Sequence, residues 1–367
     1  MAVLVWAGLG LEGLNKLILV TGGAGFIGSN FVLDWLSSSN EHVVNVDKLT
    51  YAGNRSNLRN LEGDSRHVFI EGDIADFDLL KSIFQKYKPR AVINFAAESH
   101  VDRSINGPEA FIATNIAGTY RLLQVCRDYW ASLNADSRSG FRFLHVSTDE
   151  VYGMLGPSEP AFREDTPYRP NSPYSASKAS SDHLVRAWHH TYGLPTITTN
   201  CSNNYGPYQF PEKLIPLMLV NALAGKRLPI YGDGRQVRDW LYVQDHCDAI
   251  RIVLDRGKIG ETYNIGGNSE KSNIEVVKTM CGILDGIRPR RGVGTYFDLV
   301  EHVTDRPGHD RRYAVDTTKI RNELGWRPSV TFVDGLSDTI DWYLANDWWV
   351  KQVLDGSYRR VPVGQCS

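Results

Sequence analysis

Hydroxyl and carboxyl side chains cluster directly after one apolar segment of the chain. The run FRFLHVS at 141–147 predicts a buried strand, and Thr148, Asp149 and Glu150 follow it. In an open α/β sheet the ligand site lies at the carboxyl ends of the strands, so these groups would face a bound molecule and could transfer protons. Adjacent acids after a strand also cap helices or lie in solvated loops, and partners elsewhere must decide between the two interpretations.

A tyrosine and a lysine form the second reactive pattern. Ser172 is a good N-cap and Pro173 a good first helical residue, so a helix over 173–191 places Tyr174 and Lys178 on one face, one turn apart. The ammonium group would favour the phenolate and bring the phenol toward use as a base for an alcohol. Alone, this spacing is more often a core tyrosine with a snorkelling lysine.

A glycine-rich turn indicates where a cofactor would bind. The apolar run 16–21 is followed by GGAGFIG at 22–28, which opens a helical pattern over 26–36. Glycine lets the backbone approach a pyrophosphate, and the helix N-terminus favours its charge, as in dinucleotide-binding proteins. The next strand, 42–46, ends in Asp47, an acid that would accept ribose hydroxyls and repel a 2′-phosphate, so NAD is favoured over NADP. Such an aspartate can also merely cap a turn.

Strands and helices must alternate to position these groups. Further strands are expected at 67–71, 91–95, 141–147 and 194–201, and further helices at 77–87 and 108–130. This alternation predicts an α/β protein with a Rossmann-type, doubly wound parallel sheet. Pro- and Gly-punctuated pieces follow residue 200 and indicate a smaller α/β substrate-binding lobe. We expect an extension at 1–15, an NAD-binding domain at 16–200, the lobe at 201–350 with part of 235–260 packing back on the first domain, and a tail at 351–367.

Composition excludes several classes of protein. The 367 residues carry a net charge of −2, which argues against nucleic-acid or membrane-surface binding. No run approaches the roughly 18 apolar residues of a membrane span, and residues 1–15 lack the features of a signal peptide. Five widely spaced cysteines fit reduced thiols in a cytoplasmic protein. His183, His189 and His190 lack ligand-spaced acids or thiols, so no metal site is expected.

Arginines gather at three places in the predicted lobe. These are Arg235 with Arg238, then Arg288, Arg290 and Arg291, and the segment 306–312 with His309. Arginines can clamp a diphosphate with paired hydrogen bonds, although each cluster alone is more often a solvated surface.

Several motifs together resemble the extended short-chain dehydrogenase/reductase family, in its nucleotide-sugar branch, and within that branch its 4,6-dehydratases. They are TGGAGFIG (21–28), YSASK (174–178) and NNYGP (203–207), with local matches DKLTYAGN (47–54), AAESHVDRS (96–104), STDEVYG (147–153), GDGRQVRDW (232–240) and DRPGHD (305–310). The resemblance covers the chain from about Lys16 to Asp347 without a departure at the catalytic positions. Only the N-terminal extension and the tail after Trp349 look unlike the family.

The resemblance implies an activity, a cofactor and a set of site residues. The substrate would be dTDP-glucose, with NAD tightly held, and the product dTDP-4-keto-6-deoxyglucose, formed by C4 oxidation, C5/C6 elimination and hydride return to C6. Tyr174, assisted by Lys178 and Thr148, would take the 4-hydroxyl proton, Glu150 the C5 proton, and protonated Asp149 would release the C6 hydroxyl as water. Like charges held close together push one pKa up, which could keep Asp149 protonated.

The family pattern also suggests the binding residues. For the cofactor they are Gly22, Gly25, Phe26, Ile27, Asp47, Lys48, Thr50, Asp73, Ile74, Ala96, Ser99, Thr114, Tyr174, Lys178 and Asn203. For the substrate they are Ser99, Thr148, Asn204, Glu212, Lys213, Arg238, Asn273 and His309. Asp73 could equally cap the helix at 77–87. Helices 108–130 and 173–191 would pair across a homodimer axis, although amphipathic stripes also suit packing within one chain.

Other functions remain open at this point. Related candidates are a CDP- or GDP-sugar 4,6-dehydratase, a UDP-sugar 4-epimerase and a decarboxylase. An epimerase needs only the Tyr174, Lys178 and NAD machinery, so Asp149 and Glu150 would be superfluous there. A non-catalytic NAD-sensing protein with this fold is the candidate from another class, because fold does not imply function.

Overall fold

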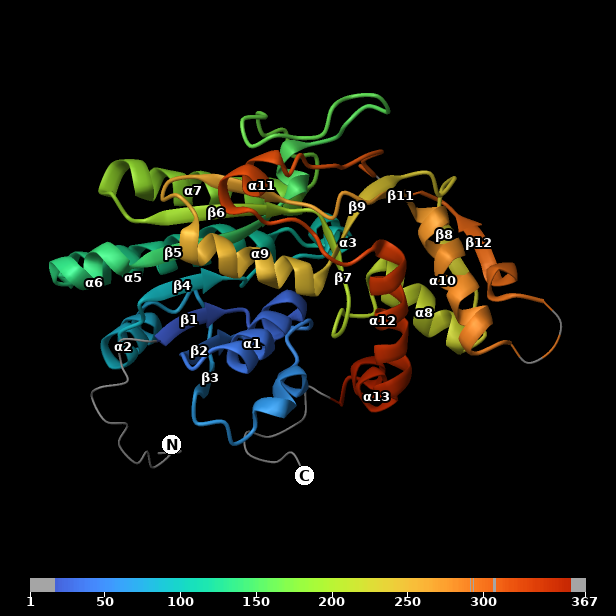
Figure 1. Ribbon diagram of the computed structural model, residues 1–367, viewed down its shortest axis with the longest axis horizontal. Coiled ribbons are helices and arrows are strands. Elements are labelled where there is room, and N and C mark those ends of the chain that lie inside the picture. Colours follow the sequence, from blue (N-terminus) through green and yellow to red (C-terminus); the bar gives the residue numbers. More distant parts are fainter. Residues whose placement is uncertain (1–16, 291, 293, 306–307, 358–367) are drawn as a thin grey trace.

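A seven-stranded parallel sheet forms the larger part of the molecule (Figure 1). The computed structural model describes residues 17–290, 292, 294–305 and 308–357. All neighbouring strands of this sheet pair in parallel. In sheet order they are β10 (Thr262–Ile265), β6 (Thr196–Cys201), β5 (Arg142–Thr148), β4 (Ala91–Asn94), β1 (Leu17–Thr21), β2 (His42–Asp47) and β3 (His67–Glu71). The predicted Rossmann-type sheet is confirmed.

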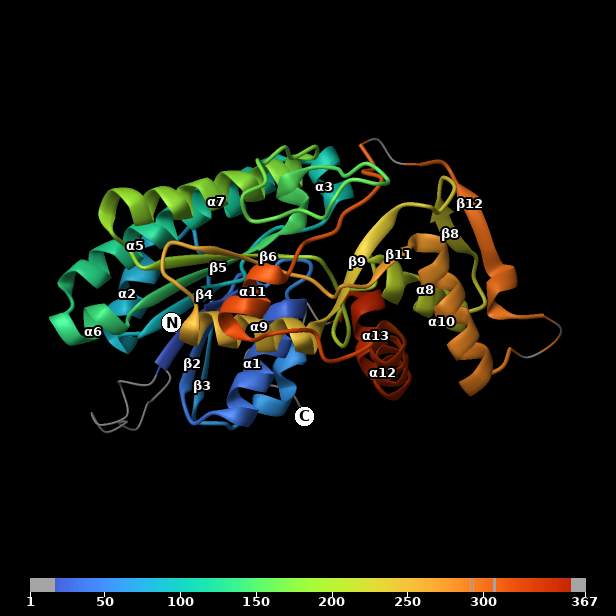
Figure 2. The same cartoon turned by 45° about the horizontal axis from the view of Figure 1, so that its top comes forward.

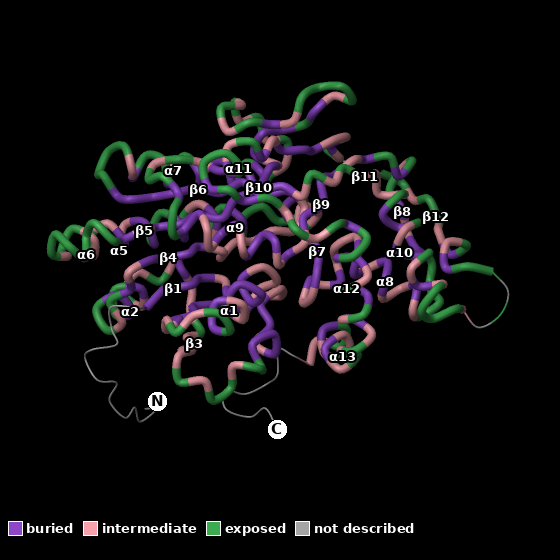
Figure 3. The backbone as a smooth tube through the Cα atoms, viewed as in Figure 1, coloured by how far each residue is buried: buried purple, intermediate pink, exposed green. Residues whose placement is uncertain are grey.

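Helices cover both faces of the sheet, as Figure 2 shows. One face carries α2 (Phe77–Tyr87), α5 (Thr119–Ser132) and α7 (Pro173–Tyr192), whose apolar side chains share a core with the strands. The other face carries α1 (Phe26–Ser38), α9 (Val243–Arg256) and α11 (Thr318–Leu324). Because both faces are covered, the central strands read as continuous apolar runs and are buried along their length (Figure 3).

A smaller α/β body lies at one end of the sheet. Its helices are α8 (Leu214–Leu223), α10 (Asn273–Ile287), α12 (Phe332–Ala345) and α13 (Asp347–Asp355). Its strands are β7 (Asn203–Tyr205), β9 (Val237–Tyr242) and β11 (Glu270–Ser272) in one sheet, and β8 (Leu228–Tyr231) with β12 (Val300–Val303) in another. A separate apolar core holds this body together. Between β9 and β11 the chain returns to the large sheet as α9 and β10.

Short helical segments join these elements. They are the 3-10 turns η2 (Arg55–Leu61), η4 (Asp149–Tyr152) and η5 (Tyr296–Leu299), and the helices α3 (Val101–Asn106), α4 (Glu109–Phe111) and α6 (Ala135–Gly140). The helix predicted over 108–130 is helical but not uniform, because a π segment, η3 (Ile112–Gly118), joins α4 to α5. The predicted start of α7 is confirmed, since Ser172 caps it in a capping box with Ser175 and Pro173 opens it.

Helix α13 ties the C-terminal part of the smaller body to the larger one. Trp349 is 1% exposed, and its indole N–H donates to Oδ1 of Asn57 on η2 at 2.7 Å. The Nδ2 group of the same Asn57 side chain donates to the Ala24 carbonyl, in the glycine-rich turn. The indole therefore satisfies a buried amide that also holds that turn.

We expect Trp349→Phe to lower the free energy of unfolding by about 1–3 kcal/mol, because it leaves the buried Asn57 oxygen without a donor. Urea denaturation followed by circular dichroism measures the change. Trp348→Phe is the matched control, since this neighbouring indole is only half-buried. Equal losses in the two variants would contradict the assigned role of the hydrogen bond.

Candidate active site

One long cavity runs over the carboxyl ends of β1, β2, β4, β5 and β6 and reaches the smaller body. Every residue predicted to contact the cofactor lines it: Gly22, Gly25, Phe26, Ile27, Asp47, Lys48, Thr50, Asp73, Ile74, Ala96, Ser99, Thr114, Tyr174, Lys178 and Asn203. The catalytic candidates Thr148, Asp149 and Glu150 line the same cavity. The fold thus brings the three sequence patterns together in one place.

The glycine-rich turn has the shape that a dinucleotide requires. Gly22 has φ +73°, and a Cβ there would lie 2.5 Å from the Ala96 backbone nitrogen. A Cβ on Gly28 would lie 2.3 Å from the Gly22 carbonyl oxygen. Gly25 begins α1 without a side-chain cap, so the first N–H groups of this helix stay available for an anion. These observations fit a diphosphate held against the backbone.

Asp47 lies where the ribose of such a cofactor is expected, and it also holds the turn. Its Oδ2 accepts from the Ala24 amide and its Oδ1 from the Leu49 amide, both at 2.8 Å. Burial raises the pKa of Asp47. Each carboxyl oxygen has a second lone pair, so these bonds leave acceptor sites for ribose hydroxyls. The cap interpretation and the binding interpretation are therefore compatible.

Asp73 does not cap α2, because Asp76 fills that position through a hydrogen bond from Leu79. The Asp73 carboxylate accepts from the Ala75 amide and pairs with Lys48 at 2.7 Å. This ion pair lies on the cavity wall and places a positive and a negative side chain near the carboxyl ends of β2 and β3.

The polar end of β5 forms the reactive corner of the cavity. Thr148 is the N-cap of η4: its hydroxyl accepts from the Glu150 amide and contacts Asp149 Oδ1, each at 3.3 Å. Asp149 is 1% exposed, and its Oδ2 has no hydrogen-bond partner among the described residues. Burial, and then the charge of Glu150, raise the pKa of Asp149 well above its usual range. The corner thus combines a buried carboxyl group, whose pKa is raised, with a half-buried one.

Tyr174 and Lys178 face this corner from α7, and both are buried. The expectation that Lys178, together with the charge of a bound nicotinamide, lowers the pKa of the phenol stays a prediction. Burial and the charge of Glu150 raise the pKa of Tyr174 well above its usual value, and burial lowers the pKa of Lys178. The hydroxyl of Thr148 acts in the opposite direction on Tyr174. A positive charge bound beside Tyr174 would favour its phenolate and act against the effect of burial.

The sequence interpretation missed Asn115, which lies inside the π segment. Its amide donates to the Glu98 carbonyl and to the Ser177 hydroxyl, and its oxygen accepts from the Glu98 amide. The side chain therefore joins the loop after β4 to the helix that carries Tyr174. An asparagine in the middle of a predicted helix was the available signal, because its side chain competes for backbone hydrogen bonds.

The substrate candidates divide into two groups. Ser99, Thr148, Asn204, Glu212 and Lys213 line the cavity. Two of them bridge the bodies: Glu212 accepts from the Tyr51 hydroxyl at 2.9 Å, and Lys213 donates to the Ser99 carbonyl at 3.0 Å. The loop residues Gln209 and Phe210, which were not predicted, also line the cavity.

Arg238, Asn273 and His309 lie outside the lining residues of this cavity. Arg238 is buried over the Tyr313 ring, donates to two backbone carbonyls, and favours ionisation of Asp149 through its charge. Asn273 begins α10, and His309 contacts Asp305 at 2.6 Å. Their proposed contacts with a substrate remain predictions.

Two arginines of the third predicted cluster make ion pairs within the protein. Arg311 pairs with Asp233 and Arg312 with Glu270, while Arg290 donates to the Thr295 carbonyl. Arg291 and Arg306 lie outside the described residues, as does Cys366.

The described part of the chain holds neither a candidate metal-binding cluster nor a candidate membrane-spanning helix. No group of three or more histidine, cysteine, aspartate or glutamate residues there could hold a metal ion. No helix in these residues is long and apolar enough to cross a bilayer.

Known proteins resemble this chain over nearly its whole length. The family described as GDP-mannose 4,6 dehydratase matches residues 19–339. The dTDP-glucose 4,6-dehydratase of Xanthomonas campestris pv. campestris (strain B100) is 63% identical over 94% of this chain and 98% of its own length. The dTDP-glucose 4,6-dehydratase 1 of Escherichia coli K12 is 58% identical over 93% and 96%. The crystal structure of DesIV, a dTDP-glucose 4,6-dehydratase from Streptomyces venezuelae with NAD and TYD bound, has 47% identity and a TM-score of 0.83, over 92% of this chain and 99% of that one.

The buried acid in the cavity should limit stability at neutral pH. Burial raises the pKa of Asp149 in the folded protein. The protonated carboxyl group therefore contributes its full stability below the unfolded pKa, about 4. This contribution is lost as pH rises through the folded pKa. Asp149→Asn stays neutral throughout. We expect it to raise the free energy of unfolding by about 1 kcal/mol or more near pH 8, with little gain near pH 4. Chemical denaturation at both pH values measures this.

Asp128→Asn is the control, since this aspartate is exposed beside Arg127. A gain from Asp149→Asn that is the same at both pH values would show that its carboxyl group is not held neutral by the fold.

Proposed function

Because the chain belongs to the extended short-chain dehydrogenase/reductase family of nucleotide-sugar dehydratases, we propose that it converts dTDP-glucose to dTDP-4-keto-6-deoxyglucose and water. The carrying observation is the shared cavity, in which the acid pair Asp149 and Glu150 lies with Tyr174 and the glycine-rich turn. Oxidation alone needs the latter two features, and elimination needs the acid pair. The two bodies and their sheets are those of the family.

NAD is the cofactor, as the close relatives that bind it indicate. When bound, it accepts a hydride from the sugar C4 and returns it to C6. Gly22, Gly25 and the start of α1 would hold its diphosphate, and Asp47 its adenosine ribose. The positive charge of its nicotinamide would offset the burial that raises the pKa of Tyr174.

Tyr174 is the proposed base for the sugar 4-hydroxyl. Lys178 supplies a positive charge from the same helix face, and the Thr148 hydroxyl stabilises the phenolate. All three side chains are at most 8% exposed, which limits the contact of the phenol with solvent. The ketone that forms at C4 makes the neighbouring C5 proton acidic.

Glu150 and Asp149 are the proposed elimination pair. Glu150 removes the C5 proton, the C5=C6 double bond forms, and the C6–O bond breaks. Asp149, whose pKa the fold raises, gives its proton to the departing hydroxyl, which leaves as water. Two adjacent carboxyl groups can perform opposite tasks because one is buried and the other only half-buried.

The remaining assignments concern the substrate's other parts. We assign contacts with sugar, diphosphate and base to Ser99, Asn204, Glu212, Lys213, Arg238, Asn273 and His309. The family description names GDP-mannose, whereas relatives at 58–63% identity act on dTDP-glucose, and these relatives favour the thymidine nucleotide. The acid pair disfavours the 4-epimerase and the decarboxylase, and the complete catalytic set disfavours a non-catalytic NAD sensor.

We also propose a cytoplasmic homodimer. Ile112 on the π segment and Tyr120 on α5 are 55% and 46% exposed, and both lie in the segment 108–130. Tyr192, the last residue of α7, is 45% exposed and directly follows the segment 173–191. These are the two segments predicted to pair. Exposed apolar side chains on adjacent helices suit a self-complementary interface.

The choice of nucleotide can be tested with one assay. Purified protein with dTDP-glucose should give a 4-keto-6-deoxy product, detected by its absorbance in alkali, and UDP-glucose or CDP-glucose should react at least about tenfold more slowly, a difference of about 1.4 kcal/mol in transition-state binding. Turnover of UDP-glucose to UDP-galactose would support the epimerase instead. No reaction with any of the three would contradict the proposed function.

Glu150→Gln separates oxidation from elimination. The amide cannot take the C5 proton, so dehydration should fall by about 10²-fold or more while oxidation at C4 continues. Transient NADH absorbance after mixing with dTDP-glucose measures the first step. Tyr174→Phe is the comparison, since it should abolish the transient. Undiminished turnover by Glu150→Gln would rule out the assignment of Glu150 as the base.

A further inference from the structure

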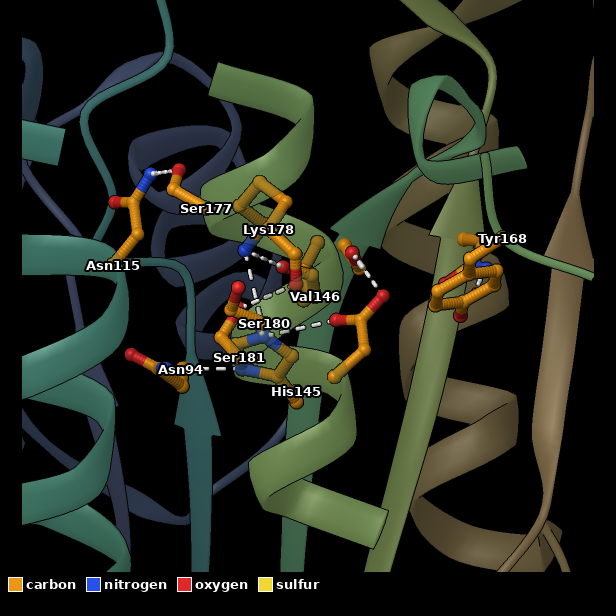
Figure 4. Close-up of polar contacts among 12 residues, drawn as sticks. Asn94, Asn115, His145, Val146, Tyr168, Ser177, Lys178, Ser180 and Ser181 are labelled. Carbon is orange, nitrogen blue, oxygen red and sulfur yellow. Dashed lines mark hydrogen bonds and ion pairs between the residues drawn. The ribbon is translucent and has the colours of Figure 1, made fainter. Parts of the chain in front are cut away.

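A buried polar cluster lies behind Lys178, on the side away from the cavity. Its members are His145, Asp182 and Ser181, with exposed fractions of 0%, 5% and 0%, and none of them lines the cavity. His145 precedes the reactive corner on β5, and Asp182 lies one turn after Lys178 on α7. Figure 4 shows His145 with dashed contacts to both Asn94 and Lys178. The proposed reaction assigns no role to this cluster.

Hydrogen bonding indicates which nitrogen of His145 carries a proton. Thr21 donates its hydroxyl to Asn94 Oδ1 at 2.6 Å, so the Asn94 NH₂ group lies toward His145 Nδ1, at 3.1 Å. The neutral ring therefore accepts at Nδ1 and carries its proton on Nε2. This nitrogen lies 3.2 Å from Ser181 Oγ and 3.3 Å from Asp182 Oδ1. Burial lowers the pKa of His145 to about 4, so the ring is neutral near pH 7.

Lys178 needs a counter-charge because it is 3% exposed. Its ammonium donates to the Val146 carbonyl at 2.9 Å and lies 3.4 Å from His145 Nε2. With a proton on that nitrogen, the ring does not accept from the lysine. The charge that offsets burial comes from Asp182, which raises the pKa of Lys178, whereas burial raises the pKa of the Cys201 thiol to about 12, so this thiol is neutral near pH 7. Ser147 holds Asp182 by donating to its Oδ2 at 2.8 Å.

We propose that Asp182 is a positioning residue for the reaction: across the neutral His145 ring it supplies the buried negative charge that keeps Lys178 protonated beside Tyr174. Tyr174, Lys178 and Asp182 then form a line of alternating groups at i, i+4 and i+8 on one helix face. Strand β5 supplies the spacer and both anchors, through His145, Val146 and Ser147. This inference rests on the proposed function, since its readout is the dehydration of dTDP-glucose.

Other titratable groups lie around Lys178 and Asp182. The elements around them contribute His145 from β5, Asp149 and Glu150 from η4, Cys201 from β6, Tyr168 from the loop before α7, and Tyr174 from α7 itself. The π segment that packs on α7 has no titratable side chain. α3 carries the half-buried Asp102 and the exposed Arg103, while Glu109 of α4 and Arg121 of α5 are exposed. Asp182 is thus the acid on the far side of Lys178, and the acid pair lies on the cavity side.

The test is the pH profile of kcat for Asp182→Asn as holoenzyme with dTDP-glucose. Removing the negative charge lowers the pKa of Lys178. The alkaline limb of the profile, where kcat falls as pH rises, should therefore move to lower pH by about one unit or more. A purely structural defect would lower kcat at every pH and leave that limb in place. Asp182→Glu keeps the charge and should keep the limb.

Two matched controls separate the charge from the hydrogen bonds. Ser181→Ala removes a hydroxyl that contacts His145, and His145→Gln removes the ring but keeps a neutral side chain; neither should move the alkaline limb. An unmoved limb in Asp182→Asn, or a moved limb in His145→Gln, would overturn the inference. If wild-type enzyme does not dehydrate dTDP-glucose, the proposed function fails instead.

Stability gives a second readout that does not need turnover. In Asp182→Asn the buried ammonium has no counter-charge at neutral pH, and this cost disappears as Lys178 loses its proton. The melting temperature of the variant should therefore lie below that of wild type near pH 7 and approach it near pH 10. A deficit that is independent of pH would contradict the inference. If Asp182→Asn does not fold, Asp182→Ser carries the same expectation.

Discussion

The parallel arrangement of the strands is the constraint on which the rest of the molecule depends. Since β1, β4, β5 and β6 all run the same way, their carboxyl ends meet at one edge, and each ends in a different part of the site. β1 leads into the glycine-rich turn, β5 into the acid pair, and β6 into the residues that begin the smaller body. The parallel strand order places groups more than a hundred residues apart in sequence at this one edge. Local caps then set the orientation of the individual side chains.

The acid pair shows how that adjustment works. Asp149 and Glu150 are adjacent in sequence, yet η4 turns one into the interior and leaves the other partly open to the cavity. Burial, rather than the identity of the side chain, is the largest cause of the raised pKa of Asp149. The same physical effect acts on Tyr174, where it opposes the reaction until a cofactor contributes charge. A positively charged nicotinamide would therefore change the electrostatics of the site.

Much of this site could be predicted from sequence because its signals are local. The glycine-rich turn, the Ser172 and Pro173 helix start, and the polar end of β5 are each specified within about ten residues. The unpredicted features depend on distant partners. The π segment contains Asn115, whose side chain bonds to Glu98 and Ser177, residues far from it in sequence. The sign of the pKa change at Tyr174 depends on total burial, which no local pattern reports.

The direct passage of strands between the two bodies has a mechanical consequence. β6 ends at Cys201 and β7 begins at Asn203, while β9 ends at Tyr242 and α9 begins at Val243, so two of the crossings between the bodies have at most one residue between elements. A hinge at either crossing would have to act next to a paired strand. Entry and exit of a ligand must then depend on side-chain contacts across the opening, such as Tyr51 with Glu212 and Lys213 with Ser99. We therefore expect side-chain contacts across the opening, rather than closure of one body onto the other, to control access to the cavity.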